Sequence, residues 1–190
     1  RQMCIRDSIK ATGEVVGDEA DLTVKFVDAE GNDRTPQPTV VAITQDNEKV
    51  ADASYGLSSK LIDATKTNDT QYKDKGLYAQ YLLQSLNLVK GKQLQLIADE
   101  GNQSSDATTL SAQLTGEGGV SVNTPGSKDE ITISNESNDF TGQTTVEGGT
   151  LIAGSANALG SADSHSNLLE LKADASFKLA DNLTTKDTVY

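Results

Sequence analysis

Residues 138–152 read NDFTGQTTVEGGTLI, and this stretch decides the fold that we expect. Apolar side chains are few in it and are separated by turn-forming residues. Val146 and Leu151 are expected to face inward on neighbouring walls of a thin core, and Phe140 to cover a corner beside that core. The stretch therefore predicts very short strands that each bury one or two side chains.

The turn formers in the same stretch have definite expected roles. Gly142 and Gly148 are expected to adopt positive φ at corners where a Cβ would clash. Asn138 is expected to hydrogen-bond the local backbone with its side chain at a turn. These residues predict a chain that bends after every short strand.

Short alternating segments recur outward from this stretch, from about residue 86 onward. Each reads as a half-buried strand, and they are Leu86-Asn87-Leu88, Leu94-Gln95-Leu96, Val120-Ser121-Val122, Ile131-Thr132-Ile133, Leu169-Glu170-Leu171 and Phe177-Lys178-Leu179. Irregular intervals of about 18 to 26 residues separate the stronger ones, as in a solenoid without a strict repeat. We expect an all-β solenoid whose coils stack inward aliphatic side chains. An antiparallel sandwich or barrel has the same short strands and stays open as an alternative.

The stretch 138–152, followed by Ala156-Asn157-Ala158-Leu159-Gly160, resembles the passenger-associated repeat of bacterial autotransporters. The resemblance is close over about residues 130–160 and weaker back through Gly116-Glu117-Gly118-Gly119-Val120. It implies a right-handed parallel β-helix. It also implies structural roles for Asn138, Phe140, Gly142, Thr144, Val146, Gly148, Gly149, Thr150, Leu151, Leu159 and Gly160.

The same resemblance implies a location and partners. An autotransporter passenger is exported to the bacterial cell surface or outer membrane, or is secreted, with the help of a C-terminal outer-membrane barrel. Its expected partners are that barrel and molecules on host or neighbouring cells. Barrel strands of roughly ten alternating residues are not visible in the sequence, so we interpret the chain as an internal fragment of a larger protein.

Residues 1–8, RQMCIRDS, differ in composition from the rest of the chain. They hold the only Cys, the only Met and two of the three Arg, and they resemble a translated sequencing-adapter peptide. We interpret them as a non-native prefix and exclude them from the fold. The rest of the chain then has no Cys, which leaves neither a disulfide framework nor a zinc site of Cys ligands.

Residues 9–85 are expected to form a less regular, β-rich segment, distinct from the coils of residues 86–190. Strands are expected over 22–27 and 39–43, and residues 44–75 are polar and charged enough to predict a long loop. The segment 77–83 reads either as a short helix or as a strand.

The charge balance excludes two classes of partner. Sixteen Lys and Arg against 28 Asp and Glu give a formal net charge of −12. Phosphate backbones and anionic lipid surfaces need clusters of basic side chains. We therefore expect no nucleic-acid partner and no binding to a membrane surface.

Catalytic chemistry has little support in the sequence. His165 is the only histidine and lies in a Ser- and Asn-rich loop without a nucleophile motif. The carboxylate pairs Asp99-Glu100 and Asp129-Glu130, together with Asp139, lie in expected turns, and Arg34 is the only Arg outside the prefix. Neither a Gly-Gly-x-Gly-x-Asp repeat nor an EF-hand loop is present for calcium. We expect no catalytic, cofactor-binding or metal site.

These observations predict a non-enzymatic stalk or display segment of an autotransporter passenger, part of a cell-surface adhesin. Two alternatives stay open at this point. One is a polysaccharide-cleaving enzyme on the same scaffold, because paired carboxylates can act as acid and base. The other is a surface module built as an antiparallel β-sandwich.

Overall fold

The computed structural model describes residues 7–10, 28–62, 76–98, 109–124, 130–160, 169–181 and 183. All regular elements among these residues are strands, which confirms the expected all-β composition. The chain divides into two compact units, residues 1–39 with 55–83 and residues 40–54 with 84–190. Two long strands, β3 (Glu48–Ile62) and β4 (Gly76–Leu88), contribute residues to both units.

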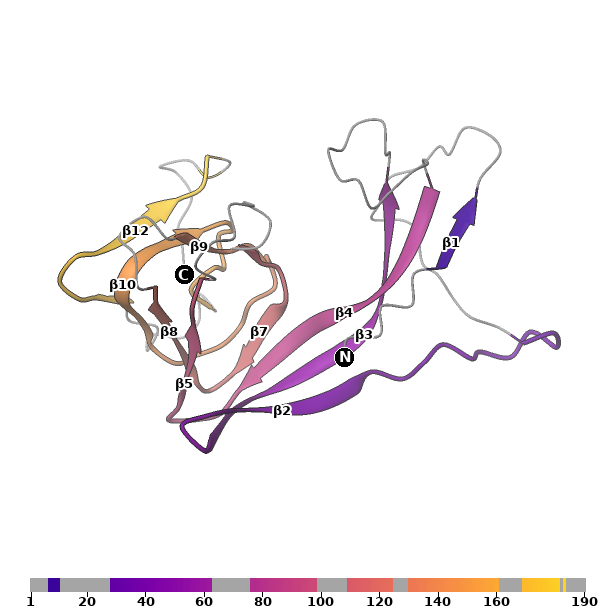
Figure 1. Cartoon of the computed structure of the whole chain (residues 1–190), viewed down its shortest axis with the longest axis horizontal. Coiled ribbons are helices and arrows are strands. Elements are labelled where there is room, and N and C mark those ends of the chain that lie inside the picture. The colour runs from indigo at the N-terminus through magenta and orange to yellow at the C-terminus, as the bar shows by residue number, and fades with distance from the viewer. Residues whose placement is uncertain are drawn as a thin grey trace. The chain divides into compact units, whose positions relative to one another are not determined.

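The first sheet is mixed, with the strand order β1-β4-β3-β2 and with β7 beside β4 (Figure 1). Its shorter strands are β1 (Asp7–Lys10), β2 (Thr39–Gln45) and β7 (Gln113–Gly116). β1 runs antiparallel to β4, whereas β7 runs parallel to β4. The Asp46-Asn47 turn joins β2 to β3, and both of its residues have positive φ, 51° and 62°. These are the angles of a type I′ hairpin turn, whose twist suits two antiparallel strands.

The second sheet has seven strands, and its path is β5-β8-β10-β9-β6 with β11 and β12 also on β10. Its neighbouring strands pair in parallel. The strands are β5 (Gln93–Leu96), β6 (Thr109–Leu110), β8 (Gly119–Asn123), β9 (Glu130–Ile133), β10 (Thr144–Ala153), β11 (Leu169–Leu171) and β12 (Ala175–Leu179).

The sheet curves because β10 bends in its middle. Its first part, Thr144–Val146, pairs with β8 and β11, and its second part, Thr150–Ala153, pairs with β9 and β12. The register with β8 shifts between Val146 and Gly148, and Gly149 has a φ of 77°. Glycine accepts this left-handed backbone without the clash of a Cβ. The two halves of β10 therefore pair with different strands and run in different directions (Figure 1).

The core consists of side chains stacked in register along the parallel strands. One column contains Leu96, Val122, Val146 and Leu171, and another contains Leu110, Ile133, Ala153 and Leu179. Val122, Val146, Ile133 and Ala153 are fully buried. Because successive side chains of a strand point to opposite faces, the residues between these positions face outward and form the site described below.

The expected right-handed parallel β-helix is wrong. The described residues form a mixed sheet and an open, curved parallel sheet, and no closed solenoid is present among them. One reason is that β10 continues through Gly148 and Gly149, where we expected the chain to break between two walls. A second reason is that β3 and β4 are 15 and 13 residues long and pair in an extended sheet. The antiparallel sandwich is not found either, because the second sheet pairs in parallel.

The expected loop over 44–75 is wrong for its first part, since residues 48–62 are strand β3. Polar side chains suggested a loop, but every buried position there is small or aliphatic, at Val50, Ala51, Ala53 and Gly56. The strand expected over 39–43 lies within β2, and 77–83 lies within β4. The strand expected over 22–27 falls outside the described residues. The division at residues 8 and 85 stays a prediction.

Candidate binding groove

An open groove of about 510 Å³ lies on the outward face of the curved sheet. The residues that line it come from β5, β8, β10 and β11 and from the turns beside them. They are polar, charged or glycine: Gly91, Lys92, Gln93, Glu117, Gly119, Gly142, Gln143, Thr145, Glu147 and Glu170.

The strand register aligns a row of outward residues beside and within the groove. Gln95, Ser121, Thr145 and Glu170 lie opposite one another across four neighbouring parallel strands. Ser121 and Thr145 retain only 8% and 3% of their exposed surface, although they face away from the aliphatic core. Of this row, Thr145 and Glu170 line the groove.

The side chain of Gln93 crosses the outward face above Gly119. Its Nε2 donates to Thr145 Oγ1 at 3.0 Å and to the Gln143 carbonyl at 3.3 Å. Gln93 lies opposite Gly119 of β8, so the amide passes over a glycine to reach β10. A Cβ on Gly119 would lie 2.0 Å from the Gln143 carbonyl oxygen. Glycine is therefore required there by close backbone packing.

Glu170 accepts hydrogen bonds from two neighbouring side chains, those of Gln143 and Lys172. Gln143 Nε2 donates to Glu170 Oε2 at 3.1 Å, and Lys172 Nζ donates to Glu170 Oε1. This hydrogen bond, with the negative charges of Glu170 and Glu147, raises the pKa of Lys172 above its ordinary value, against a smaller opposing effect of desolvation. Glu170 is thus held in a fixed orientation by two donors.

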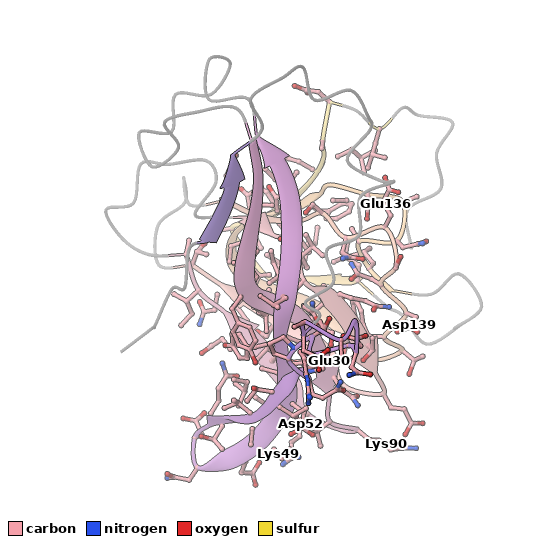
Figure 2. The ribbon with its side chains drawn as sticks, turned by 90° about the vertical axis from the view of Figure 1, so that its right-hand side faces the viewer. Glu30, Lys49, Asp52, Lys90, Glu136 and Asp139 are labelled. Atoms are coloured by element: carbon pink, nitrogen blue, oxygen red, sulfur yellow. The ribbon has the colours of Figure 1, made fainter. Side chains whose placement is uncertain are left out.

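Ion pairs form the rim. Lys90 Nζ lies 3.2 Å from Glu117 Oε1, with both side chains mostly exposed, and Lys92 pairs with Glu48. Lys90 lies in the turn that follows β4 (Figure 2). Exposed pairs of this kind contribute about 0 to 1 kcal/mol each and weaken with salt. They set the charge of the rim more than they stabilise the fold.

Polar groups of several kinds line the groove. Its side chains offer amide, hydroxyl, carboxylate and ammonium groups that can hydrogen-bond a polar ligand. Within the described part of the chain, no three His, Cys, Asp or Glu residues gather to hold a metal ion.

No helix among these residues is long and apolar enough to span a membrane.

The structure places most residues of the quoted stretch at buried positions. Asn138, Phe140, Thr144, Val146, Thr150 and Leu151 are all at most 4% exposed. Gly149 and Gly160 have positive φ. Leu159 is buried beside Gly160. Their roles as members of a passenger-type repeat stay a prediction.

Two expectations about turns are wrong. Gly142 and Gly148 do not have positive φ; Gly142 is needed because a Cβ would lie 2.3 Å from the Gly118 carbonyl carbon. Asn138 does not bond its own local backbone. Its Oδ1 accepts from the backbone N–H of Leu114, 2.8 Å away and 24 residues earlier in the chain, and its buried Nδ2 has no partner.

The carboxylates considered for catalysis do not form a described site. Glu130 pairs with Lys178, and Asp139 is exposed in the segment that leads to β10 (Figure 2). Asp99, Glu100, Asp129 and His165 lie outside the described residues. Arg34 pairs with Asp28 at 2.9 Å in a local loop.

The groove was not expected from the sequence. A signal for it was present in the middle residues of the alternating segments, Gln95, Ser121 and Glu170, which alternate with the aliphatic residues. Nothing in the sequence shows that these positions align across four strands, because the intervals between them depend on loop lengths and on the bulge in β10.

Comparisons with known proteins give two relatives, both from Escherichia coli strain K12. The chain is 32% identical over 146 residues to "uncharacterized lipoprotein YdeK" and 26% identical over 152 residues to "uncharacterized protein YuaQ". These matches cover 77% and 75% of the chain but only 10% and 11% of the relatives. The chain thus spans about a tenth of their length. No protein-family model and no solved structure matches it significantly.

Proposed function

We propose that this chain is a non-enzymatic display segment of an autotransporter passenger, part of an adhesin at the bacterial cell surface. The observation that carries the proposal is the row of outward polar side chains held in register over the buried columns. Parallel strands stacked in this way give a rigid scaffold with a polar face that is already ordered. A preordered face loses less entropy when it binds a partner.

The location is supported by the relatives. One of them is described as a lipoprotein, and a lipid anchor ties a protein to a membrane of the cell envelope. Both are about ten times longer than the matched segment, which suits a segment that extends or positions a longer protein. We infer the same surface or envelope location for this chain.

The partner is proposed to be a polar molecule on host or neighbouring cells that contacts the groove. Gln143, directly before β10, Glu147 of β10 and Glu170 of β11 line the groove. Their amide and carboxylate groups can hydrogen-bond hydroxyl and amino groups. We take these contacts to be binding contacts, and the polysaccharide panel described below tests that choice.

The test is binding of the purified full chain to immobilised glycans, matrix proteins and cultured cells. We expect binding that falls at least about tenfold in the double variant Gln143→Ala with Glu147→Ala, since each lost hydrogen bond contributes about 1 kcal/mol or more when charged. The matched control is Lys49→Ala with Asp52→Ala, which removes a polar pair on β3 outside the groove (Figure 2) and should leave binding unchanged.

Two results would contradict the proposal. One is the absence of binding to every surface while circular dichroism shows a folded chain. The other is cleavage of any polysaccharide in the panel, which would make the chain an enzyme. Surface proteolysis of intact cells that carry the full-length protein tests location separately, and protection of this segment would contradict display.

A further inference from the structure

One carboxylate in the groove has no ionic partner among the described residues. The other charged residues that line the groove are each paired with a neighbouring side chain, and the pairs are Lys92–Glu48, Glu117–Lys90 and Glu170–Lys172. Glu147 of β10 also lines the groove and is exposed. Its negative charge is therefore available to a ligand.

The nearest cation of known position beside Glu147 is already engaged. The Lys172 N–H donates to the Val146 carbonyl at 3.0 Å, which places Lys172 next to Glu147 across the paired strands. The Lys172 ammonium bonds Glu170 instead. The pKa of Lys172 is raised first by this hydrogen bond and by the charge of Glu170, and further by the charge of Glu147, against opposing desolvation. Two carboxylates and one ammonium leave a negative charge at this end of the groove, which attracts a cation.

A buried hydroxyl in the groove has a hydrogen to donate. Thr145 is only 3% exposed, yet it lines the groove. Its Oγ1 accepts from Gln93 Nε2 at 3.0 Å, and a hydroxyl can also donate one hydrogen bond. No acceptor for that hydrogen is found within the described ranges. Because an unmade hydrogen bond of a buried group costs stability, this hydroxyl points to a ligand oxygen as its partner.

The spacing of the groove residues suits an extended peptide. Gln143, Thr145 and Glu147 are alternate residues of one chain segment, and alternate residues of a strand repeat every ~6 to 7 Å on one face. An extended peptide repeats its own groups at the same spacing. Gln143 Nε2 donates to Glu170, which leaves Gln143 Oε1 to accept from a peptide N–H. No aromatic ring is among the lining residues to stack on the apolar face of a sugar.

We propose that the groove binds an extended segment of a partner protein that carries a lysine or arginine, whose cation pairs with Glu147 while its backbone bonds Gln143 and Thr145. The inference rests on the proposed function and names the class of its partner. The net charge of −12 is complementary to a basic segment and speeds its approach. The groove of about 510 Å³ lies within the range of roughly 300 to 1,000 Å³ that is usual for ligand pockets, so it holds one short segment.

The test is an NMR titration of the full chain with the probe acetyl-Gly-Lys-Gly-amide. A second probe, acetyl-Gly-Gln-Gly-amide, is similar in size and uncharged. We expect the lysine probe to shift the amide signals of Gln143, Thr145 and Glu170. The glutamine probe should bind about threefold to fivefold more weakly, because it lacks one exposed ion pair. Binding of the lysine probe should also weaken as salt rises.

Single substitutions separate the groove from the overall charge. Glu147→Gln should weaken binding of the lysine probe about threefold to fivefold. The matched control is Glu136→Gln, which removes the same charge from an exposed residue between β9 and β10 that does not line the groove (Figure 2) and should leave binding unchanged. Lys172→Met removes the competing ammonium and should strengthen binding about twofold.

Equal binding of the two peptide probes would overturn the inference, and so would equal losses in Glu147→Gln and Glu136→Gln. A third probe, methyl glucosaminide, carries the same ammonium on a sugar. If it shifts the groove amides and the lysine probe does not, the peptide class is wrong. The proposed function is judged separately. If the chain binds cells or matrix through Gln143 and Glu147 but does not bind the lysine probe, only this inference is overturned.

Discussion

The side chain of Gln45 occupies the place of a neighbouring strand beside Gln95. Gln45 Nε2 donates to the Gln95 carbonyl at 2.9 Å, and the Gln95 N–H donates to Gln45 Oε1 at 2.8 Å. β5, which contains Gln95, is the terminal strand on its side of the curved sheet. A primary amide carries one donor and one acceptor in the same plane, as a peptide group does. The amide therefore closes an edge that would otherwise be open.

Gln45→Ala is expected to destabilise the second unit by about 1 to 2 kcal/mol, because two hydrogen bonds at a partly exposed edge are lost. Urea unfolding measures the change, and hydrogen exchange should quicken at the Gln95 amide. Gln45→Glu keeps the acceptor for that amide and loses the donor, so it should fall between Gln45→Ala and the original chain. Equal stability of all three would show that the amide pair contributes nothing.

Gly119 and Gly148 offer a graded test of backbone packing. An ideal Cβ on Gly119 lies 2.0 Å from the Gln143 carbonyl oxygen. An ideal Cβ on Gly148 lies 3.3 Å from the Thr124 carbonyl oxygen. Neither glycine has positive φ. An alanine at either position therefore adds a Cβ contact without forcing the backbone into a conformation that alanine disfavours. We expect Gly119→Ala to cost about 3 kcal/mol and Gly148→Ala less than about 1 kcal/mol, by thermal unfolding. The reverse order would contradict the close approach of β8 and β10.

Asn138 satisfies a buried N–H that no strand pairs. Asn138→Ala leaves the Leu114 N–H without an acceptor and is expected to cost about 1 to 3 kcal/mol. Asn135 provides a matched control, because its Nδ2 donates to the Ser111 carbonyl at 2.8 Å, also 24 residues earlier, but at an exposed site. Asn135→Ala should cost less than about 1 kcal/mol in the same denaturant titration. Equal losses would mean that burial does not matter here.

The loop around Asp28 should respond to acid. The pKa of the Asp28 carboxyl is lowered below its ordinary value of 3.8, first by the backbone N–H of Asn32 and then by the Asn32 and Arg34 side chains and the Glu30 N–H, against opposing desolvation. A lowered pKa means that the stabilisation is present above the ordinary value and is lost as pH falls through the lowered one.

Amide chemical shifts of Glu30 and Asn32 should therefore titrate together at a pH below 3.8. Asp28→Asn removes the charge and is the control, in which this transition should disappear. A midpoint above 3.8, or shifts that persist in Asp28→Asn, would show that the carboxylate does not organise the loop.

The sequence by itself indicated the all-β composition, several of the short strands and part of the core, but not the long strand β3. Alternating segments such as Val120-Ser121-Val122 and Ile131-Thr132-Ile133 are strands that bury their aliphatic residues, because a strand has a two-residue period whatever it pairs with. It also indicated that Val146, Leu151 and Phe140 would be buried. These properties depend on local periodicity and on the hydrophobicity of single residues.

Only the tertiary structure decided how the strands associate. Whether β10 breaks or bends at Gly148 and Gly149 depends on the partners along both of its halves, and the loops set which residues face each other. The alignment of Gln95, Ser121, Thr145 and Glu170 into one row, and the reach of Gln45 to Gln95, join residues that are distant in the chain. Such contacts are fixed by register across strands, and one residue of slip would turn each polar side chain to the other face.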